Sequence, residues 1–133
     1  MGVKSTTLQQ QVLDYIFGLG ADGPVETNFF IALHTVAPAT DGTGGTEVSG
    51  TGYARQSTTP DTDYTRTGQS VTNDNDIDFG TAGSAWGTVV AVTIWDASTS
   101  GNLVYVKTLV APRTIASGDP VKFNAGDLIF TDI

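Results

Sequence analysis

The most constraining feature of this sequence is a succession of short apolar runs, rich in β-branched residues, with turn residues between them. Clear runs lie at residues 29–35, 89–95 and 103–106. Runs of this length fit strands better than helices, and the Gly, Ser, Asn and Asp residues between them favour tight turns. The chain has 16 glycines, and charged residues make up 15% of it, below the roughly 25% of ordinary soluble domains. These features predict a mainly β fold.

The length of the chain predicts a single domain over residues 1–133, which is enough to bury a core. Residues 29–133 are expected to form a single β-sandwich or flattened barrel of about seven or eight antiparallel strands. Residues 38–52 interrupt the strand pattern, because they hold five glycines and almost no apolar side chains. We expect a long exposed loop there, and loops of that length are usually functional or ordered by a partner.

One N-terminal amphipathic helix is expected at residues 5–19. Its apolar side chains recur at the helical period, namely Leu8, Val12, Tyr15, Ile16 and Leu19. Thr6 and Gln9 fit a capping box, and the nearby glycines supply an end. A short helix needs something to pack against, so we expect it to cover one open face or end of the β core. The alternative is an arm that docks on a neighbouring subunit.

The charge balance argues against nucleic-acid and membrane partners. The net charge is −8, and the 6 basic residues are scattered singly along the chain. Nucleic-acid binding needs clustered Lys and Arg, and an anionic membrane surface attracts the same clusters. No apolar run approaches the roughly 20 residues that span a bilayer. The first residues, MGVKSTTLQQQ, lack the apolar core of a signal peptide, so we expect synthesis in a cytosol without an export signal of the chain's own.

Candidates for catalysis are few. The chain has no cysteine, which excludes disulfides and thiolate metal sites. His34 is its one histidine, and no G-x-S-x-G sequence is present to position a serine beside it. Both glutamates, Glu26 and Glu47, flank loops, which disfavours a glycosidase pair. We therefore expect a protein that is not an enzyme and binds no cofactor, with His34 as a hydrogen-bonded structural residue.

Asp74, Asp76 and Asp78 form a D-x-D-x-D sequence, which is how calcium-binding loops begin. An EF-hand loop continues with glycine at its sixth position and glutamate at its twelfth. Here Gly80 stands at the seventh position and Ala85 at the twelfth. Alternate spacing also places the three carboxylates on one face of a strand, where water solvates them. We favour the solvated face and keep a metal site as the weak alternative.

Four aromatic residues could form a sugar-binding platform, namely Tyr53, Trp86, Trp95 and Tyr105. Trp and Tyr within strands are more often core residues with one polar edge in contact with water. We therefore expect the tryptophans to be buried.

Several segments, taken in order, resemble a known family. They are FFIALHT, PATDGTGGTEVSGTGYARQ, WGTVVAVTIWDASTSGNLVYV and TIASGDPVKFNAGDLIF. The most specific part is Ala-Leu-His-Thr, followed by the Gly/Thr-rich loop, Glu-Val-Ser-Gly and Gly-Tyr-Ala-Arg-Gln. The chain is similar to small virion structural proteins of tailed bacteriophages, which are described as tail-fibre-like, minor tail or head-accessory proteins.

This resemblance implies a structural role in the virion, after synthesis in the host bacterial cytoplasm, with no cofactor and no reaction. Its partners would be other virion proteins, either capsid or tail subunits, and a homo-oligomer is expected, with a trimer as one candidate. We favour a capsid decoration or cement protein, because the chain is short for a fibre and has neither repeats nor heptads. The alternative is a tail or tail-fibre-associated protein. A carbohydrate- or host-surface-binding module is the second alternative.

The long loop and the residues that follow it supply the predicted interaction residues, namely Thr43, Gly44, Glu47, Tyr53 and Arg55. Glu47 and Arg55 lie toward the end of the loop, and His34 lies before it. An ion pair between Glu47 and Arg55 would therefore hold the base of this loop.

Overall fold

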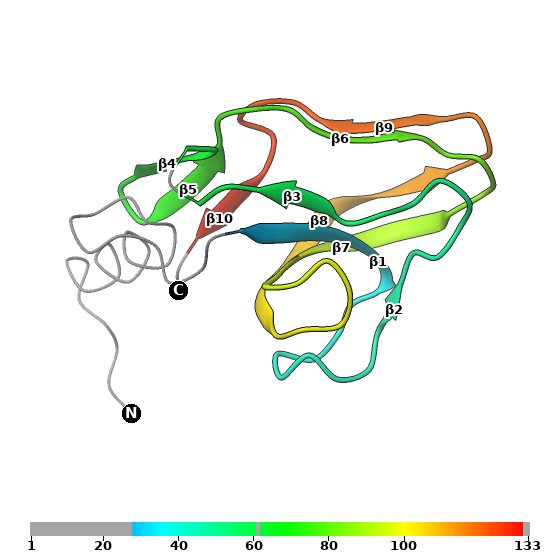
Figure 1. The fold of residues 1–133 in the computed structure, drawn as a ribbon, viewed down its shortest axis with the longest axis horizontal. Coiled ribbons are helices and arrows are strands. Elements are labelled where there is room, and N and C mark those ends of the chain that lie inside the picture. The colour runs from blue at the N-terminus through cyan, green and yellow to red at the C-terminus, as the bar shows by residue number, and fades with distance from the viewer. Residues whose placement is uncertain (1–27, 61, 132–133) are drawn as a thin grey trace. The chain divides into compact units, whose positions relative to one another are not determined.

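The computed structural model describes residues 28–60 and 62–131. These residues are mainly β and contain no helix, so no membrane-spanning helix is found among them. The helix expected at residues 5–19 lies outside the described residues. The ten strands are β1 Phe29–Val36, β2 Thr46–Glu47, β3 Gln56–Thr58, β4 Tyr64–Thr67, β5 Ser70–Asn73, β6 Ile77–Thr81, β7 Gly87–Trp95, β8 Leu103–Ile115, β9 Pro120–Phe123 and β10 Ile129–Thr131 (Figure 1).

The chain divides into two compact units. The larger unit contains residues 29–58 and 78–122, and the described residues of the smaller unit are 28, 59–60, 62–77 and 123–131. The prediction of a single domain over residues 1–133 stays a prediction.

The larger unit is built on an antiparallel sheet with the strand order β2-β1-β7-β8, in which β3 also pairs with β1. Its two central strands, β1 and β7, are buried on both faces. Ile31 opposes Ile94, and Leu33 opposes Val92, and all four side chains are at most 1% exposed. The continuous apolar run at residues 29–35 therefore forms the buried strand that its composition predicts.

A second sheet consists of β6 and β9, which run side by side in Figure 1. Phe79 and Val121 are buried, whereas Asp78 and Lys122 are exposed. This alternation agrees with a half-buried strand whose one acidic residue, Asp78, is on the outer face. Asp74 and Asp76 precede β6, so the expectation that the three aspartates share one face of a strand is wrong.

The smaller unit contains the antiparallel sheet β10-β5-β4. Tyr64, Val71 and Phe130 form its buried centre, and the Tyr64 and Phe130 rings meet edge to face with centroids 6.4 Å apart. Asn73 closes the turn at residues 124–127, because its Oδ1 accepts the Leu128 N–H at 3.0 Å and its Nδ2 donates to the Asn124 carbonyl at 3.0 Å. Such a buried amide is stable because its donors and acceptor are paired.

Two details of the predicted fold are wrong. The described strands number ten rather than seven or eight, and they form separate open sheets that do not close into a barrel. The additional strands include β2 and β3, which are only two and three residues long. Both exist because they pair with β1, and such long-range pairing leaves little local pattern. Residues 38–52 are accordingly less exposed than expected, since Val48 is buried and donates its N–H to the Leu33 carbonyl.

Candidate interaction site

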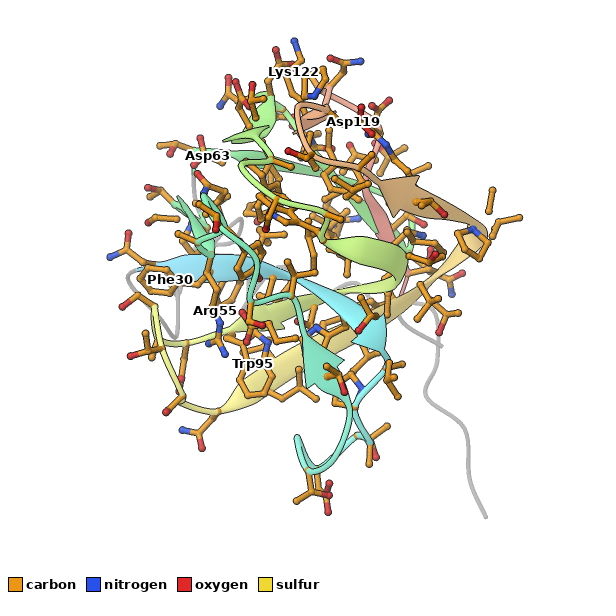
Figure 2. All side chains as sticks on the ribbon, turned by 90° about the vertical axis from the view of Figure 1, so that its right-hand side faces the viewer. Phe30, Arg55, Asp63, Trp95, Asp119 and Lys122 are labelled. Atoms are coloured by element: carbon orange, nitrogen blue, oxygen red, sulfur yellow. The ribbon has the colours of Figure 1, made fainter. Side chains whose placement is uncertain are left out.

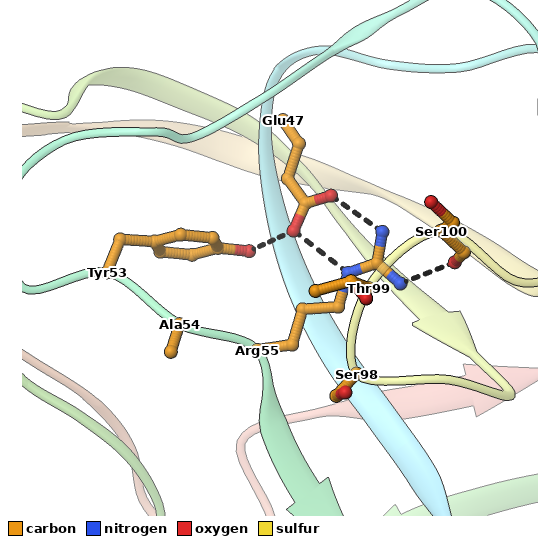
Figure 3. A pocket seen from close by; sticks show the side chains of 7 residues that line it. All are labelled: Glu47, Tyr53, Ala54, Arg55, Ser98, Thr99 and Ser100. Carbon is orange, nitrogen blue, oxygen red and sulfur yellow. Dashed lines mark hydrogen bonds and ion pairs between the residues drawn. The ribbon is translucent and has the colours of Figure 1, made fainter.

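The candidate site lies in the larger unit, where the end of the long loop meets the hairpin between β7 and β8. A pocket of about 430 Å³ opens there (Figure 3). Its lining residues are Glu47, Tyr53, Ala54, Arg55, Ser98, Thr99 and Ser100. The volume falls within the range of roughly 300–1,000 Å³ that is typical of ligand pockets.

The predicted ion pair between Glu47 and Arg55 is present and has two hydrogen bonds. Arg55 Nη2 lies 2.8 Å from Glu47 Oε1, and Arg55 Nε lies 3.0 Å from Glu47 Oε2. The Arg55 side chain is 7% exposed and that of Glu47 is 27% exposed. A bidentate pair that is shielded from water in this way is stronger and more directional than an ordinary surface ion pair.

The remaining contacts of Arg55 bind the hairpin. Its Nη1 donates to the carbonyls of Ala97 and Ser100, each at 2.9 Å. Its guanidinium carbon also lies 4.5 Å from the centroid of the Trp95 ring, as a cation–π contact (Figure 2). One side chain thus joins β2 to the loop at residues 96–102.

Tyr53 connects this pair to the central strand β1. Its hydroxyl oxygen accepts the Leu33 N–H at 3.0 Å, and its hydroxyl donates to Glu47 Oε2 at 2.8 Å. The Tyr53 ring stacks on Phe79 with centroids 6.0 Å apart and meets the edge of Trp86 at 5.5 Å. We call Glu47, Tyr53, Arg55 and Trp95 the Arg55 cluster.

The protonation states in the Arg55 cluster follow from its packing. Burial raises the pKa of Tyr53, so its hydroxyl remains a donor. Burial also acts to raise the pKa of Glu47, but the hydrogen bonds from Arg55 and Tyr53 and the charge of Arg55 outweigh it and hold this pKa below its ordinary value. At neutral pH the cluster therefore holds one negative and one positive charge, which compensate each other.

His34 stacks on Trp95 of the cluster, with ring centroids 6.3 Å apart, and is only 3% exposed. Trp95 Nε1 donates to Thr93 Oγ1 at 2.7 Å, and Thr93 Oγ1 lies 3.3 Å from His34 Nδ1. The Thr93 hydroxyl has two acceptor lone pairs and one proton, so which partner donates in its contact with Nδ1 depends on the histidine tautomer. Burial lowers the pKa of His34, and Glu47 partly opposes this effect. The hydrogen-bonded structural role predicted for His34 agrees with these contacts.

The hairpin loop has a fixed and strained backbone. Ser100 has φ +52°. Among the described residues, every other residue with a positive φ is a glycine. Gly101 has φ +80°, and a Cβ atom there would lie 2.5 Å from Asp96 Oδ1. Asp96 also accepts the Asn102 N–H at 2.6 Å, and such hydrogen bonds lower the pKa of Asp96. Strain of this kind persists only where surrounding contacts hold it, as Arg55 does here.

The structure brings together three of the five predicted interaction residues, Glu47, Tyr53 and Arg55. Thr43 and Gly44 do not line the pocket. Both are exposed, and Asp41 Oδ1 accepts the Thr43 N–H at 3.0 Å, so they belong to a separate turn of the long loop.

Sequence reasoning missed the part of the site that the hairpin contributes. The turn at residues 96–102 is predicted from its Ser, Thr, Gly and Asn content, but its contact with Arg55 uses the backbone carbonyls of Ala97 and Ser100. Backbone acceptors carry no residue signature, so no pattern in the sequence identifies them.

The three aspartates of the D-x-D-x-D sequence have separate partners. Asp74 accepts a hydrogen bond from the Thr65 hydroxyl, Asp76 accepts one from the Ala125 N–H, and Asp78 accepts one from the Gly80 N–H. In the part of the chain that the structure describes, no group of three or more acidic or histidine side chains is placed to hold a metal ion.

The tryptophans are buried as predicted. Trp86 is 4% exposed and Trp95 is 8% exposed, and Trp86 Nε1 donates to the Thr51 carbonyl at 3.0 Å. Neither ring can serve as an exposed platform for a sugar. The carbohydrate-binding alternative therefore loses its main support.

A family model described as podophage GP4 fiber I protein gp80 matches residues 3–131 of the chain. The match extends over both compact units and includes all ten described strands. No curated protein matches the sequence.

Proposed function

The chain belongs to the podophage GP4 fiber I protein family, and from this premise we propose that it is a non-enzymatic structural component of the tail fibre or of the tail part that carries it. The family match confirms the resemblance to virion structural proteins of tailed phages. It also confirms that the protein is located in the virion.

The family match supports the tail or fibre alternative rather than the capsid decoration that the sequence analysis favoured. That preference rested on a short chain without repeats or heptads. A fibre can be assembled from short domains as well as from one long repetitive chain. Shortness therefore does not distinguish the two locations.

The observation that best supports a structural role is that the polar groups of the Arg55 cluster form hydrogen bonds with one another and with the hairpin backbone. Arg55 donates to Glu47 and to two hairpin carbonyls, while Tyr53 donates to Glu47. These groups fix two loops on a rigid sheet, and fixed loops on a rigid scaffold are the usual form of a recognition surface. We propose that the loops at residues 38–52 and 96–102 contact neighbouring virion proteins.

The partners proposed here are other virion proteins, and the homo-oligomer expected from the resemblance is part of the same proposal. Size-exclusion chromatography with light scattering on the purified chain tests the oligomer. A monomer at micromolar concentration would remove that part and leave the location untouched.

The copy number of the chain in purified virions tests the proposed location. It can be measured by quantitative mass spectrometry against a capsid protein of known copy number. A fibre or tail component predicts a few copies to a few tens of copies per particle. Hundreds of copies would contradict the proposal and return the chain to capsid decoration.

A further inference from the structure

Strand β8 lies at one end of the sheet order β2-β1-β7-β8, so it is an edge strand among the described residues. Its pairing with β7 is interrupted, because Ala91 opposes Thr108 and Val89 opposes Arg113. Residues 109–112 are therefore inserted into the ladder as a bulged segment. Bulges at sheet edges turn side chains outward and prevent pairing with further strands.

This bulged segment, residues 109–112, has the sequence Leu-Val-Ala-Pro and is unusually exposed. Val110 is 102% exposed, Ala111 and Pro112 are exposed, and Leu109 is half-buried. Single exposed apolar residues are ordinary, but a run of three to four exposed apolar residues is rarely kept without a function. The exposure of this run is a property of the bulge, since a regular edge strand would turn alternate side chains inward.

The charges around the bulged segment contrast with those of the whole chain. Lys107 precedes it and Arg113 follows it, and β8 contains no acidic residue. The chain as a whole carries a net charge of −8. A partner that complements this strand must therefore offer an apolar surface with acidic groups around it.

We propose that the bulged segment is a docking knob, in which Val110 inserts into an apolar pocket with an acidic rim on another virion protein. The identity of this partner as a virion protein rests on the proposed function, whereas its chemistry rests on β8. Two observations disfavour other occupants. An anionic membrane would be repelled by the net charge of −8, and pairing of a second copy with the edge would be interrupted by the bulge.

The first experiment measures how much of each variant is incorporated into purified virions, relative to a capsid protein. Val110→Ser removes the apolar contact, and a Lys107→Glu, Arg113→Glu double variant reverses the charge. Each is expected to lower incorporation about tenfold, as loss of a central interface contact does. Val36→Ser is the matched control, because Val36 is also exposed, at 54%, in the same unit. A Lys107→Arg, Arg113→Lys variant keeps the charge, and both controls should stay within about twofold of the wild type.

These variants also separate docking from simple protection of a strand edge. Charged edge residues prevent aggregation with either sign of charge. Unchanged incorporation of both Val110→Ser and the charge-reversed variant, with thermal midpoints equal to that of the wild type, would overturn the proposal.

The second experiment places a photoreactive amino acid at position 110 in assembled virions, with position 78, which is exposed on β6 and lies outside both proposed contact loops, as a control. Cross-links from position 110 to an acid-rich segment of a different virion protein are the expected result. Cross-links only to a second copy of this chain would overturn the proposed partner, and so would binding of the wild type, but not of Val110→Ser, to phosphatidylglycerol vesicles.

The two proposals fail in different ways. A cross-link to a capsid subunit would contradict the fibre location and leave the docking knob in place. The absence of any cross-link at position 110, in a chain present at tail copy number, would overturn the docking knob and leave the location in place.

Discussion

Two segments of the larger unit differ in how their residues are held: one has many contacts within the chain, and the other is exposed. The hairpin loop at residues 96–102 is bound internally, because Arg55 donates to two of its carbonyls and Asp96 closes its base. The bulged segment at residues 109–112 follows on the next strand, and its central residue, Val110, is fully exposed. The first is held by intramolecular contacts, whereas the described part of the chain leaves Val110, Ala111 and Pro112 of the second exposed. The rigid loop and the segment that is exposed for binding are therefore different parts of one sheet.

The largest expected effect comes from Arg55→Met. This change leaves the partly buried Glu47 without its counter-ion and removes both carbonyl contacts. Breaking a buried ion pair costs about 3–5 kcal/mol, and the partial exposure of Glu47 reduces this to about 2–3 kcal/mol in the free energy of unfolding. Urea unfolding measures the loss, and hydrogen exchange should show faster exchange at residues 39–47 and 96–102.

A Glu47→Gln, Arg55→Met double variant is the control for the Glu47 carboxylate that Arg55→Met leaves without a counter-ion. It should regain part of the stability that Arg55→Met loses, because no unpaired carboxylate remains. Loop exchange in Arg55→Met that equals that of the wild type would show that the Arg55 cluster does not fix the hairpin.

The next effect comes from Gly101→Ala in the hairpin. The new Cβ atom would adopt φ +80° and lie 2.5 Å from Asp96 Oδ1. We expect a loss of about 2 kcal/mol, from backbone strain plus displacement of the loop. Gly118→Ala is the matched control, since Gly118 has φ +89° but no heavy atom within 4 Å of a Cβ. Equal losses in the two variants, measured by thermal unfolding, would mean that the hairpin is not tightly packed.

A smaller effect is expected from pH through His34. Burial lowers its pKa in the folded state below the ordinary value of 6.5. The unfolded chain therefore binds a proton that the folded chain does not bind below pH 6.5, and stability is complete above that pH and falls as the pH drops. Thermal midpoints between pH 7.5 and 5.5 should fall for the wild type and change less for His34→Gln. Parallel curves for the two proteins would contradict this assignment.

The smallest effect on stability is expected from Val110→Ser. Its side chain is fully exposed, so the free energy of unfolding should change by less than about 0.5 kcal/mol. A loss above about 1 kcal/mol in urea unfolding would show that Val110 is part of the core in solution and would remove the contrast between the two segments.

Features of the fold that depend on neighbouring residues could be predicted from the sequence. The apolar run that forms β1 and the turn after Trp95 are of this kind, and so is the burial of Trp86. The Glu47–Arg55 ion pair was also predictable, because both residues lie near the end of one loop and carry opposite charges. The prediction of one strand face for the three aspartates at residues 74–78 was wrong, because only Asp78 lies in a strand and Asp74 and Asp76 lie between β5 and β6.

Features that depend on distant pairing could not be predicted in this way. β2 has two residues and exists through its pairing with β1, and the sheets remain open because their strand order is set by contacts far apart in sequence. Pro112 is a local signal of an edge strand or a bulge, since proline cannot donate to a strand ladder, but Leu-Val-Ala before it resembles an ordinary apolar strand. The length of the inserted segment follows only from the register with β7.

Hydrogen exchange of the wild-type chain, free and in assembled virions, tests the central contrast most directly. Hydrogen bonds at the base of the hairpin loop predict that the amides of Asp96 and Asn102 are protected in both states, since they donate to the Asn102 carbonyl and to Asp96 Oδ1. The amides of Leu109, Val110 and Ala111 are predicted to exchange rapidly in the free chain and to become protected in the virion. Rapid exchange at residues 109–111 in both states, or protection in both, would contradict the account.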